Sequence, residues 1–228
     1  MFDAHRHYGS SMSENALYAT SSRYEWELLS SLTPPALGGI GALADNPLPE
    51  IEAFEQILKT FPDFQIAEVG LDRRFPEIEQ QEAFLKDTLA LAYELGRSVS
   101  LHCVKEDGRM LSLLRSLQPN LPVLLWHGYT GSWETAQEAT KLGVILGYGS
   151  RLFGSKLARE GKRLVTLPYA LETDFQMGDY SQILWTQIEN FSKLSGCTHD
   201  ELIRNNDEIR TILTHNTSTR RGTGRTPS

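Results

Sequence analysis

Residues 66–71 read IAEVGL, and the stretches SVSLHCV at 98–104 and PVLLWH at 122–127 have the same apolar character. Nearly continuous apolar runs of this length are typical of parallel strands that are covered on both faces. Similar runs recur along the chain, so the sequence predicts eight strands, at residues 1–4, 16–20, 36–41, 65–71, 98–104, 121–127, 142–148 and 166–173.

Amphipathic segments separate these runs. In residues 51–61, apolar side chains such as Phe54, Ile57 and Phe61 recur at helical spacing. Further helices are predicted at 79–95, from a Ser132 cap to residue 142, at about 181–195, and at 198–213 with Thr198 as its cap. Repeated strand–helix units predict an α/β fold with a parallel sheet that is either open or closed into a barrel.

Two regions depart from this alternation. Residues 149–165 are basic and interrupted by glycines, which predicts a loop with a short helix. Residues 216–228 show no apolar periodicity, and we expect a disordered C-terminal tail after a single domain at 1–215. Without the tail, the chain is close to the lower length of a (β/α)₈ barrel, roughly 200 residues, so a barrel would have one trimmed or distorted unit.

Composition and charge narrow the class of protein. Hydrophobic residues make up 40% of the 228 residues and the net charge is -7, so an acidic globular protein is expected, without general attraction to nucleic acid or anionic membranes. Cys103 and Cys197 do not make a disulfide framework. With no charged-then-apolar leader and no long apolar run, we expect a cytoplasmic protein with no membrane association and no obligate protein partner.

Metal-binding residue types gather where the predicted strands end. Four of the six histidines and two carboxylates lie there, namely His5, His7, Glu68, His102, His127 and Asp174. Strand C-termini of a parallel barrel converge on one mouth, and catalytic groups sit at that mouth. Any one of these residues alone could be a hydrogen-bonded buried polar group. Together they exceed the three protein ligands of a typical catalytic zinc and suit two metal ions that share a carboxylate.

The ordered blocks DAHRH (3–7), AEVGLD (67–72), LHC (101–103), WHGYTGS (126–132) and LETD (171–174) resemble the TatD-type metal-dependent deoxyribonucleases of the amidohydrolase-like barrel superfamily. The resemblance runs from residue 2 to about 213 and includes CTHDELIRNNDEI (197–209), which is similar to the family's closing helix. It implies a TIM-like (β/α) barrel, compact or slightly distorted.

The resemblance also implies roles for these residues. His5 and His7 would bind one divalent ion together with Asp174, Glu68 would bridge two ions, and His102 with His127 would hold the second. Asp174 would in addition accept a proton from the attacking water, so Asp174 and Glu68 are the catalytic candidates. The two ions would be Zn²⁺, Mg²⁺ or Mn²⁺. The substrate would be DNA or a small phosphodiester, and cleavage could include the removal of nucleotides from a strand end.

The sequence departs from the family pattern at several positions near the site. Val104 stands where the family has an arginine, GGIGAL (38–43) replaces a segment containing His-Pro, and Phe175-Gln176 replaces a small residue and proline. These departures affect the substrate pocket and leave the candidate ligands in place. Candidate phosphate contacts are Arg73, Arg74, Lys105 and Arg151, and candidate base contacts are Tyr129, Phe153 and Trp133, the last of which has the helical spacing of a core residue. Asp3 is expected to orient an imidazole, with a structural role as the alternative.

Two alternatives remain open from the residues. An amidohydrolase or esterase could use the same barrel, although no lysine ends a predicted strand to serve as a carboxylated bridge. A degenerate barrel that binds metal without catalysis would explain the missing arginine and the short chain. His199 and His215 lie in a polar helix start and near the tail, so we expect both in solvent.

Overall fold

A computed structural model of the chain describes residues 1–7, 15–32 and 37–215. Its centre is one eight-stranded sheet in which every neighbouring pair is parallel and the spatial order follows the chain. The strands are β1 (Asp3–His7), β2 (Ala16–Ala19), β3 (Gly38–Ala42), β4 (Gln65–Asp72), β5 (Val99–Val104), β6 (Leu124–Trp126), β7 (Val144–Tyr148) and β8 (Tyr169–Leu171). Each overlaps one of the eight predicted regions, although β1 runs three residues beyond the predicted end at residue 4 and β3 and β4 each run one residue beyond theirs.

The sheet curls until its last strand reaches its first. Just beyond β8, the Asp174 N–H donates to the His5 carbonyl at 3.0 Å, and the His7 N–H donates to the Phe175 carbonyl at 2.9 Å. These two bonds join the segment that follows β8 to β1. The predicted α/β fold with a TIM-like barrel is therefore confirmed.

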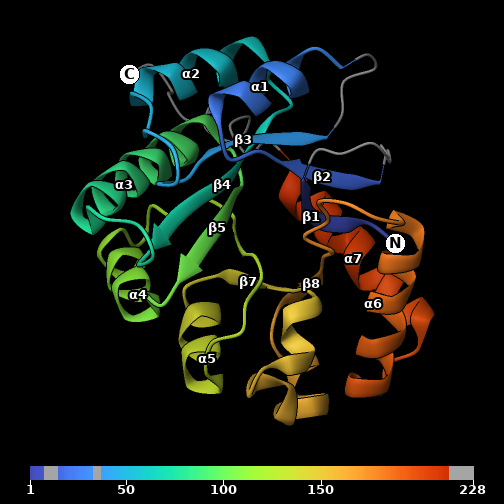
Figure 1. Cartoon of the computed structure of the whole chain (residues 1–228). Coiled ribbons are helices and arrows are strands. Elements are labelled where there is room, and N and C mark those ends of the chain that lie inside the picture. The colour runs from blue at the N-terminus through green and yellow to red at the C-terminus, as the bar shows by residue number, and fades with distance from the viewer. Residues whose placement is uncertain (8–14, 33–36, 216–228) are drawn as a thin grey trace, which may run out of the picture.

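Helices surround the strands (Figure 1). They are α1 (Arg23–Ser30), α2 (Ile51–Thr60), α3 (Ile78–Leu95), α4 (Asp107–Ser116), α5 (Trp133–Lys141), α6 (Tyr180–Ser195) and α7 (His199–Thr214). Ser132 and Thr198 cap α5 and α7 as predicted, and Thr198 forms a full capping box with Glu201. Helices α1 and α4 were not among the predicted ones.

The unit after β7 is the irregular one. Two 3₁₀ segments, η1 (Ser150–Gly154) and η2 (Leu157–Thr166), stand where a regular barrel would carry an α-helix, and Gly161 breaks the second with φ 53°. The basic composition and glycines of this region predicted only a loop and a short helix. The expected distortion of one strand–helix unit therefore lies between β7 and β8.

Helix α7 fastens the base of the barrel through Asn206, which is fully buried. Its Nδ2 donates to the carbonyls of Phe2 and Leu171, both at 2.7 Å, and its Oδ1 accepts from the Leu171 N–H at 2.9 Å. One side chain thus links the strand β8 to the residue that precedes β1. The amide adds a second point of closure, three residues before the hydrogen bond between Asp174 and His5 on each strand.

Most buried apolar side chains lie in one cluster between the helices and the outside of the barrel. On β5, Leu101 belongs to this cluster, whereas its neighbours Ser100 and His102 take part in side-chain hydrogen bonds to groups of the barrel interior, because successive strand residues face opposite sides. Among the described residues, no helix combines the length and apolar character needed to cross a bilayer. The predicted tail at 216–228 lies outside the described residues, so its separation from a domain at 1–215 stays a prediction.

Candidate metal centre

The six strand-end residues singled out from the sequence meet at the mouth of the barrel around Glu68. Its Oε1 lies 2.8 Å from His102 Nδ1 and 2.8 Å from His127 Nε2. Its Oε2 faces the first strand, 3.5 Å from His7 Nε2 and 4.0 Å from His5 Nε2. The two oxygens of one carboxylate therefore face two different histidine pairs.

Asp174 completes the side of the site that β1 forms. Its Oδ1 lies 3.3 Å from His7 Nε2, and its backbone adopts the left-handed conformation with φ 50°. Aspartate tolerates this conformation better than most residues, because its short polar side chain can hydrogen-bond locally. The turn occurs immediately before the chain leaves the barrel wall, where the hydrogen bond from Asp174 N–H to His5 holds it.

The arrangement leaves buried polar atoms unsatisfied. Within the described ranges, His5 Nε2 and Glu68 Oε2 are buried and have no hydrogen-bond partner. Two overlapping trios, His5–His7–Asp174 and His5–Glu68–His127, each place one ligand atom per residue within 4.8 Å of the others. Imidazole nitrogens and carboxylate oxygens are ligands for divalent ions, and coordination would remove the cost of these unpaired buried atoms. The residues present thus fit a metal ion.

The protonation states of Glu68, Asp174 and His5 also suit metal binding, whereas, despite burial, the neighbouring carboxylates raise the pKa of His7 and of His102. Burial opposes ionisation of Glu68, but the neighbouring His127 and His102 hold its pKa well below the usual range. Burial likewise disfavours ionised Asp174, yet the His7 hydrogen bond and the nearby imidazoles lower its pKa to about 2. Burial lowers the pKa of His5 well below its ordinary value. Ionised carboxylates and a neutral imidazole are the forms that coordinate metals.

A second layer of contacts holds the imidazoles in place. His5 Nδ1 lies 2.8 Å from Ser100 Oγ, and its ring stacks on that of His127 with centroids 4.0 Å apart. His102 Nε2 lies 3.1 Å from Asp72 Oδ2, so this ring is held at both nitrogens. Each of these contacts fixes a ring orientation, and with it the direction of the nitrogen that faces Glu68.

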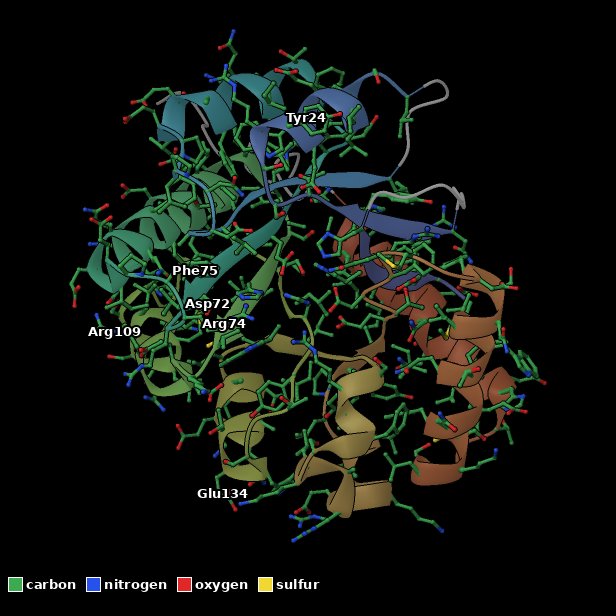
Figure 2. The ribbon with its side chains drawn as sticks, in the orientation of Figure 1. Tyr24, Asp72, Arg74, Phe75, Arg109 and Glu134 are labelled. Atoms are coloured by element: carbon green, nitrogen blue, oxygen red, sulfur yellow. The ribbon has the colours of Figure 1, made fainter. Side chains whose placement is uncertain are left out.

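Asp72 and Glu172 belong to the site but were not singled out from the sequence. Asp72 binds Arg74 through both carboxylate oxygens, and the two residues lie together near the end of β4 (Figure 2). Glu172 is fully buried, accepts the Gly128 N–H at 2.6 Å, and lies 3.9 Å from His127 Nδ1. Strand alternation could have indicated both, because Asp72 lies four residues after Glu68 and Glu172 two before Asp174.

Burial raises the pKa of Glu172 well above its usual range, and the Asp174 charge adds to the effect. The carboxyl group fits only because β7 has a glycine beside it. A Cβ at Gly147 would lie 2.2 Å from Glu172 Oε2 and 2.9 Å from His127 Cα. Gly147 therefore allows Glu172 to approach the histidine that ends β6.

Asp3 occupies a different place from the expected one. Its carboxylate accepts from the Thr173 N–H at 2.9 Å, the Thr173 hydroxyl at 2.6 Å and the His5 backbone N–H at 3.4 Å. The expected hydrogen bond to an imidazole is not formed within the described part of the chain, since Ser100 takes the His5 ring instead. Asp3 joins β1 to the segment after β8 and so acts on the backbone.

The four basic candidates have different surroundings. Arg73 pairs with Glu106, and Arg74 with Asp72, so both are engaged by carboxylates beside the site. Arg151 Nη2 lies 3.3 Å from Asp174 Oδ2, with its side chain largely exposed. Lys105 is exposed and, with Arg151, lines a pocket of about 250 Å³ that also includes His102 and His127.

The aromatic candidates are mostly structural. Tyr129 is buried, with its hydroxyl donating to the Ser132 carbonyl at 2.8 Å, and Trp133 is covered by Arg163. Phe153 is half-buried and stays accessible. Phe175, one of the departures from the family pattern, packs on the buried guanidinium of Arg6, which also lies over the rings of Tyr18 and Tyr180. His199 is half-buried against Trp185, whereas His215 is exposed as expected.

Known proteins match this chain in sequence. A family model described as TatD related DNase matches residues 38–204, which is most of the chain. The 3'-5' ssDNA/RNA exonuclease TatD of Edwardsiella piscicida is 35% identical over 95 residues, 41% of this chain and 36% of that protein. Its counterpart in Klebsiella pneumoniae strain 342 is 40% identical over 84 residues, 36% of this chain and 32% of that protein. The chain thus spans about a third of the length of these relatives.

Solved structures show the same fold. The TatD homologue YJJV from Escherichia coli K12 superposes with a TM-score of 0.71 at 19% identity, covering 87% of this chain and 85% of that one. A TatD family hydrolase from Entamoeba histolytica gives 0.69 at 13% identity, covering 89% and 85%. His5 and His7 precede the residues that the family model matches, and the fold brings them to the histidines inside it. The chain belongs to the TatD related DNase family.

Proposed function

We propose that this chain is a divalent-metal-dependent hydrolase that cleaves phosphodiester bonds, in DNA or in a small phosphodiester, and that it can remove nucleotides from a strand end. The observation that carries the proposal is the position of Glu68, whose two oxygens face separate histidine pairs. Family membership and relatives named as 3'-5' ssDNA/RNA exonucleases support the choice of phosphodiester over amide or carboxyl ester.

The proposed ligand sets follow the two faces of Glu68. His5, His7 and Asp174 would hold one ion, His102 and His127 the other, and Glu68 would contact both. Divalent ions at such a site supply charge neutralisation and lower the pKa of bound water from 15.7 to about 7, which is worth roughly 12 kcal/mol. The imidazoles favour Zn²⁺, whereas the carboxylates Glu68 and Asp174 also suit Mn²⁺ and Mg²⁺.

The chain's own contribution to bond cleavage centres on Asp174. With its pKa near 2, the carboxylate is ionised at neutral pH and can orient an attacking water and accept its proton. A positioned general base contributes about 10²–10⁴ in rate. Two further carboxylates support the ligands from behind. Glu172 holds the backbone next to His127, and Asp72 holds the His102 ring.

Arg151 is the best placed cation for the substrate. Its guanidinium lies beside Asp174 and is exposed, so it can turn to a phosphoryl oxygen without leaving a buried carboxylate unpaired. Lys105 borders the same pocket. Arg74 and Arg73 are less suited, because their carboxylate partners Asp72 and Glu106 are buried and would lose their counterions.

The test is hydrolysis of bis-p-nitrophenyl phosphate with added Mn²⁺, Zn²⁺ or Mg²⁺, together with elemental analysis of the purified protein. Release of p-nitrophenol should require a divalent ion and fall at least 10²-fold in Asp174→Asn. Asp200→Asn, an exposed carboxylate at the start of α7, is the matched control and should retain the activity. End-labelled single-stranded DNA then distinguishes stepwise from internal cleavage.

Protein that binds no divalent ion and whose metal content is unchanged in His102→Ala would contradict the binuclear site. A protein that hydrolyses p-nitrophenyl acetate in preference to the phosphodiester would contradict the assignment to phosphodiesters and indicate an esterase on the same barrel.

A further inference from the structure

A second cavity opens directly on the candidate catalytic residue. It has a volume of about 630 Å³ and lies between η1, the segment after β8 and α6, with Asp174 at its edge. Its other lining includes Phe153, Gln176, Met177, Gln182, Ile183 and Asn190. We call this cavity the α6 groove.

The α6 groove combines apolar surface with unused amide groups. Met177 is 80% exposed, and Phe153 and Ile183 are partly exposed beside it. In the part of the chain that the structure describes, the side-chain amides of Gln176, Gln182 and Asn190 form no hydrogen bond, although each can both donate and accept. A ligand that is flat, apolar on its faces and polar at its edges would match such a lining.

Charge separates the α6 groove from the rest of the mouth. Among the described residues that line it, Asp174 alone is ionisable. Arg151 reaches Asp174 Oδ2 at 3.3 Å from a separate cavity of about 720 Å³, which is also lined by Lys156 and by the carboxylates Glu134 and Glu160. A phosphodiester bound at Asp174 would thus have the Arg151 guanidinium on one side and a neutral cavity on the other.

From this geometry we infer that the α6 groove binds the nucleobase of the nucleotide that adjoins the scissile phosphate. Bases stack on aromatic side chains, here Phe153, and present hydrogen-bonding edges that amides can read, and they carry no charge that the groove would have to neutralise. Gln176 stands where the family has proline, so this contact would be a feature of this chain. The inference rests on the proposed phosphodiesterase function and specifies its substrate.

The test compares two chromogenic substrates that differ by the nucleoside: thymidine 5'-(p-nitrophenyl phosphate) and methyl p-nitrophenyl phosphate. In both, water attacks phosphorus, the bond to the p-nitrophenyl oxygen breaks, and p-nitrophenolate leaves. The metal-loaded enzyme should show at least tenfold higher kcat/KM for the thymidine substrate, mostly through a lower KM. Base stacking of the usual strength corresponds to fivefold or more.

Groove variants should reduce that preference. In Phe153→Ala, which removes the aromatic face, the ratio of the two kcat/KM values should fall about fivefold or more, and Gln182→Ala should also lower it. Trp185→Ala is the matched control, because Trp185 is an exposed large hydrophobic residue of α6 that does not line the groove. Calorimetry gives a readout that does not depend on turnover: Met177→Ala should weaken binding of thymidine 5'-monophosphate and leave that of 2-deoxyribose 5-phosphate unchanged.

Different failures have different meanings. Hydrolysis of both substrates with equal kcat/KM, or a preference unchanged in both groove variants, would overturn the nucleobase assignment and leave the phosphodiesterase intact. If an abasic deoxyribose analogue is preferred over methyl p-nitrophenyl phosphate as strongly as the thymidine substrate is, the groove binds the sugar. That result would also overturn the nucleobase assignment. Hydrolysis of neither substrate with any of the three metals would overturn the proposed function and this inference together.

Discussion

The Asp174 N–H donates to the His5 carbonyl at 3.0 Å, so residues from the two ends of the barrel sequence are tied through their backbones. Both side chains belong to the candidate metal centre, and Asp3 adds hydrogen bonds to Thr173 beside the same junction. The site therefore depends on closure of the barrel between β8 and β1. Interactions that close the barrel elsewhere should affect the site as well as stability.

Asn206→Ala tests this closure at the base of the barrel. The substitution removes three hydrogen bonds and leaves the Phe2 and Leu171 backbone groups unpaired in a buried place. Each unsatisfied buried group costs about 1–3 kcal/mol, so the free energy of unfolding should fall by about 3 kcal/mol or more. Urea unfolding followed by circular dichroism measures it.

Asn205→Ala is the control for that experiment. Its side chain donates to the Tyr169 carbonyl at 3.0 Å from a part-buried position, so about 1 kcal/mol should be lost. Equal losses in the two variants would show that Asn206 has no special part in closing the barrel.

Glu68→Gln tests the bridging carboxylate. The amide keeps the size of the side chain but cannot supply two anionic oxygens, and its NH₂ group would face one of the two histidine pairs. We expect metal content to fall below the proposed two ions, and hydrolysis of bis-p-nitrophenyl phosphate to fall at least 10²-fold, since the joint charge stabilisation by two ions is lost. Glu52→Gln, an exposed carboxylate on α2, should change neither. Unchanged metal content in Glu68→Gln would contradict the bridging role.

The barrel could be predicted because buried parallel strands leave apolar runs that are visible in the sequence. All eight predicted regions overlap a strand, and the Thr198 cap was predicted from local chemistry that a capping box requires. Helix α4 was missed, since Gly108 near its start and its mixed polar pattern weaken the helical signal. Helix α1 was missed because it is only eight residues long and buries only two side chains, Trp26 and Leu29, which is too few to show a helical period.

The candidate site was predictable in its residue types and less so in its contacts. Strand ends gather at one mouth by topology, so His5, His102 and Asp174 could be expected together. The partner of Asp3 could not be, because Thr173 lies 170 residues away and only the completed closure brings it near. Likewise, Arg74 turns to Asp72 instead of the open mouth because a buried carboxylate two residues away competes for it.

Asp72→Asn tests whether Asp72 positions His102. The carboxylate takes His102 Nε2 at 3.1 Å and thereby fixes the ring whose Nδ1 faces Glu68. Loss of such a supporting contact typically weakens metal affinity 10–100-fold, which competition with a chromogenic chelator would measure. Arg74→Ala should have a smaller effect, since that guanidinium is mostly exposed and its pairing is screened by solvent. Equal affinity in Asp72→Asn and the wild-type chain would assign Asp72 to local structure only.

Gly147→Ala and Gly108→Ala should act in opposite directions. A methyl group at Gly147 would collide with Glu172 Oε2 at 2.2 Å and with His127 Cα at 2.9 Å, so either the carboxyl or the end of β6 must move. Overpacking of this kind costs about 1–3 kcal/mol of the free energy of unfolding and should also weaken metal binding, because His127 is displaced.

At Gly108, inside α4, nothing lies within 4 Å of the added carbon, so alanine should stabilise the chain by about 0.5–1 kcal/mol through its higher helix propensity. Thermal unfolding with and without Mn²⁺ separates the two effects: the metal-induced rise in Tm should shrink in Gly147→Ala and persist in Gly108→Ala. A full metal-induced rise in Gly147→Ala would mean that Glu172 can move away without disturbing His127.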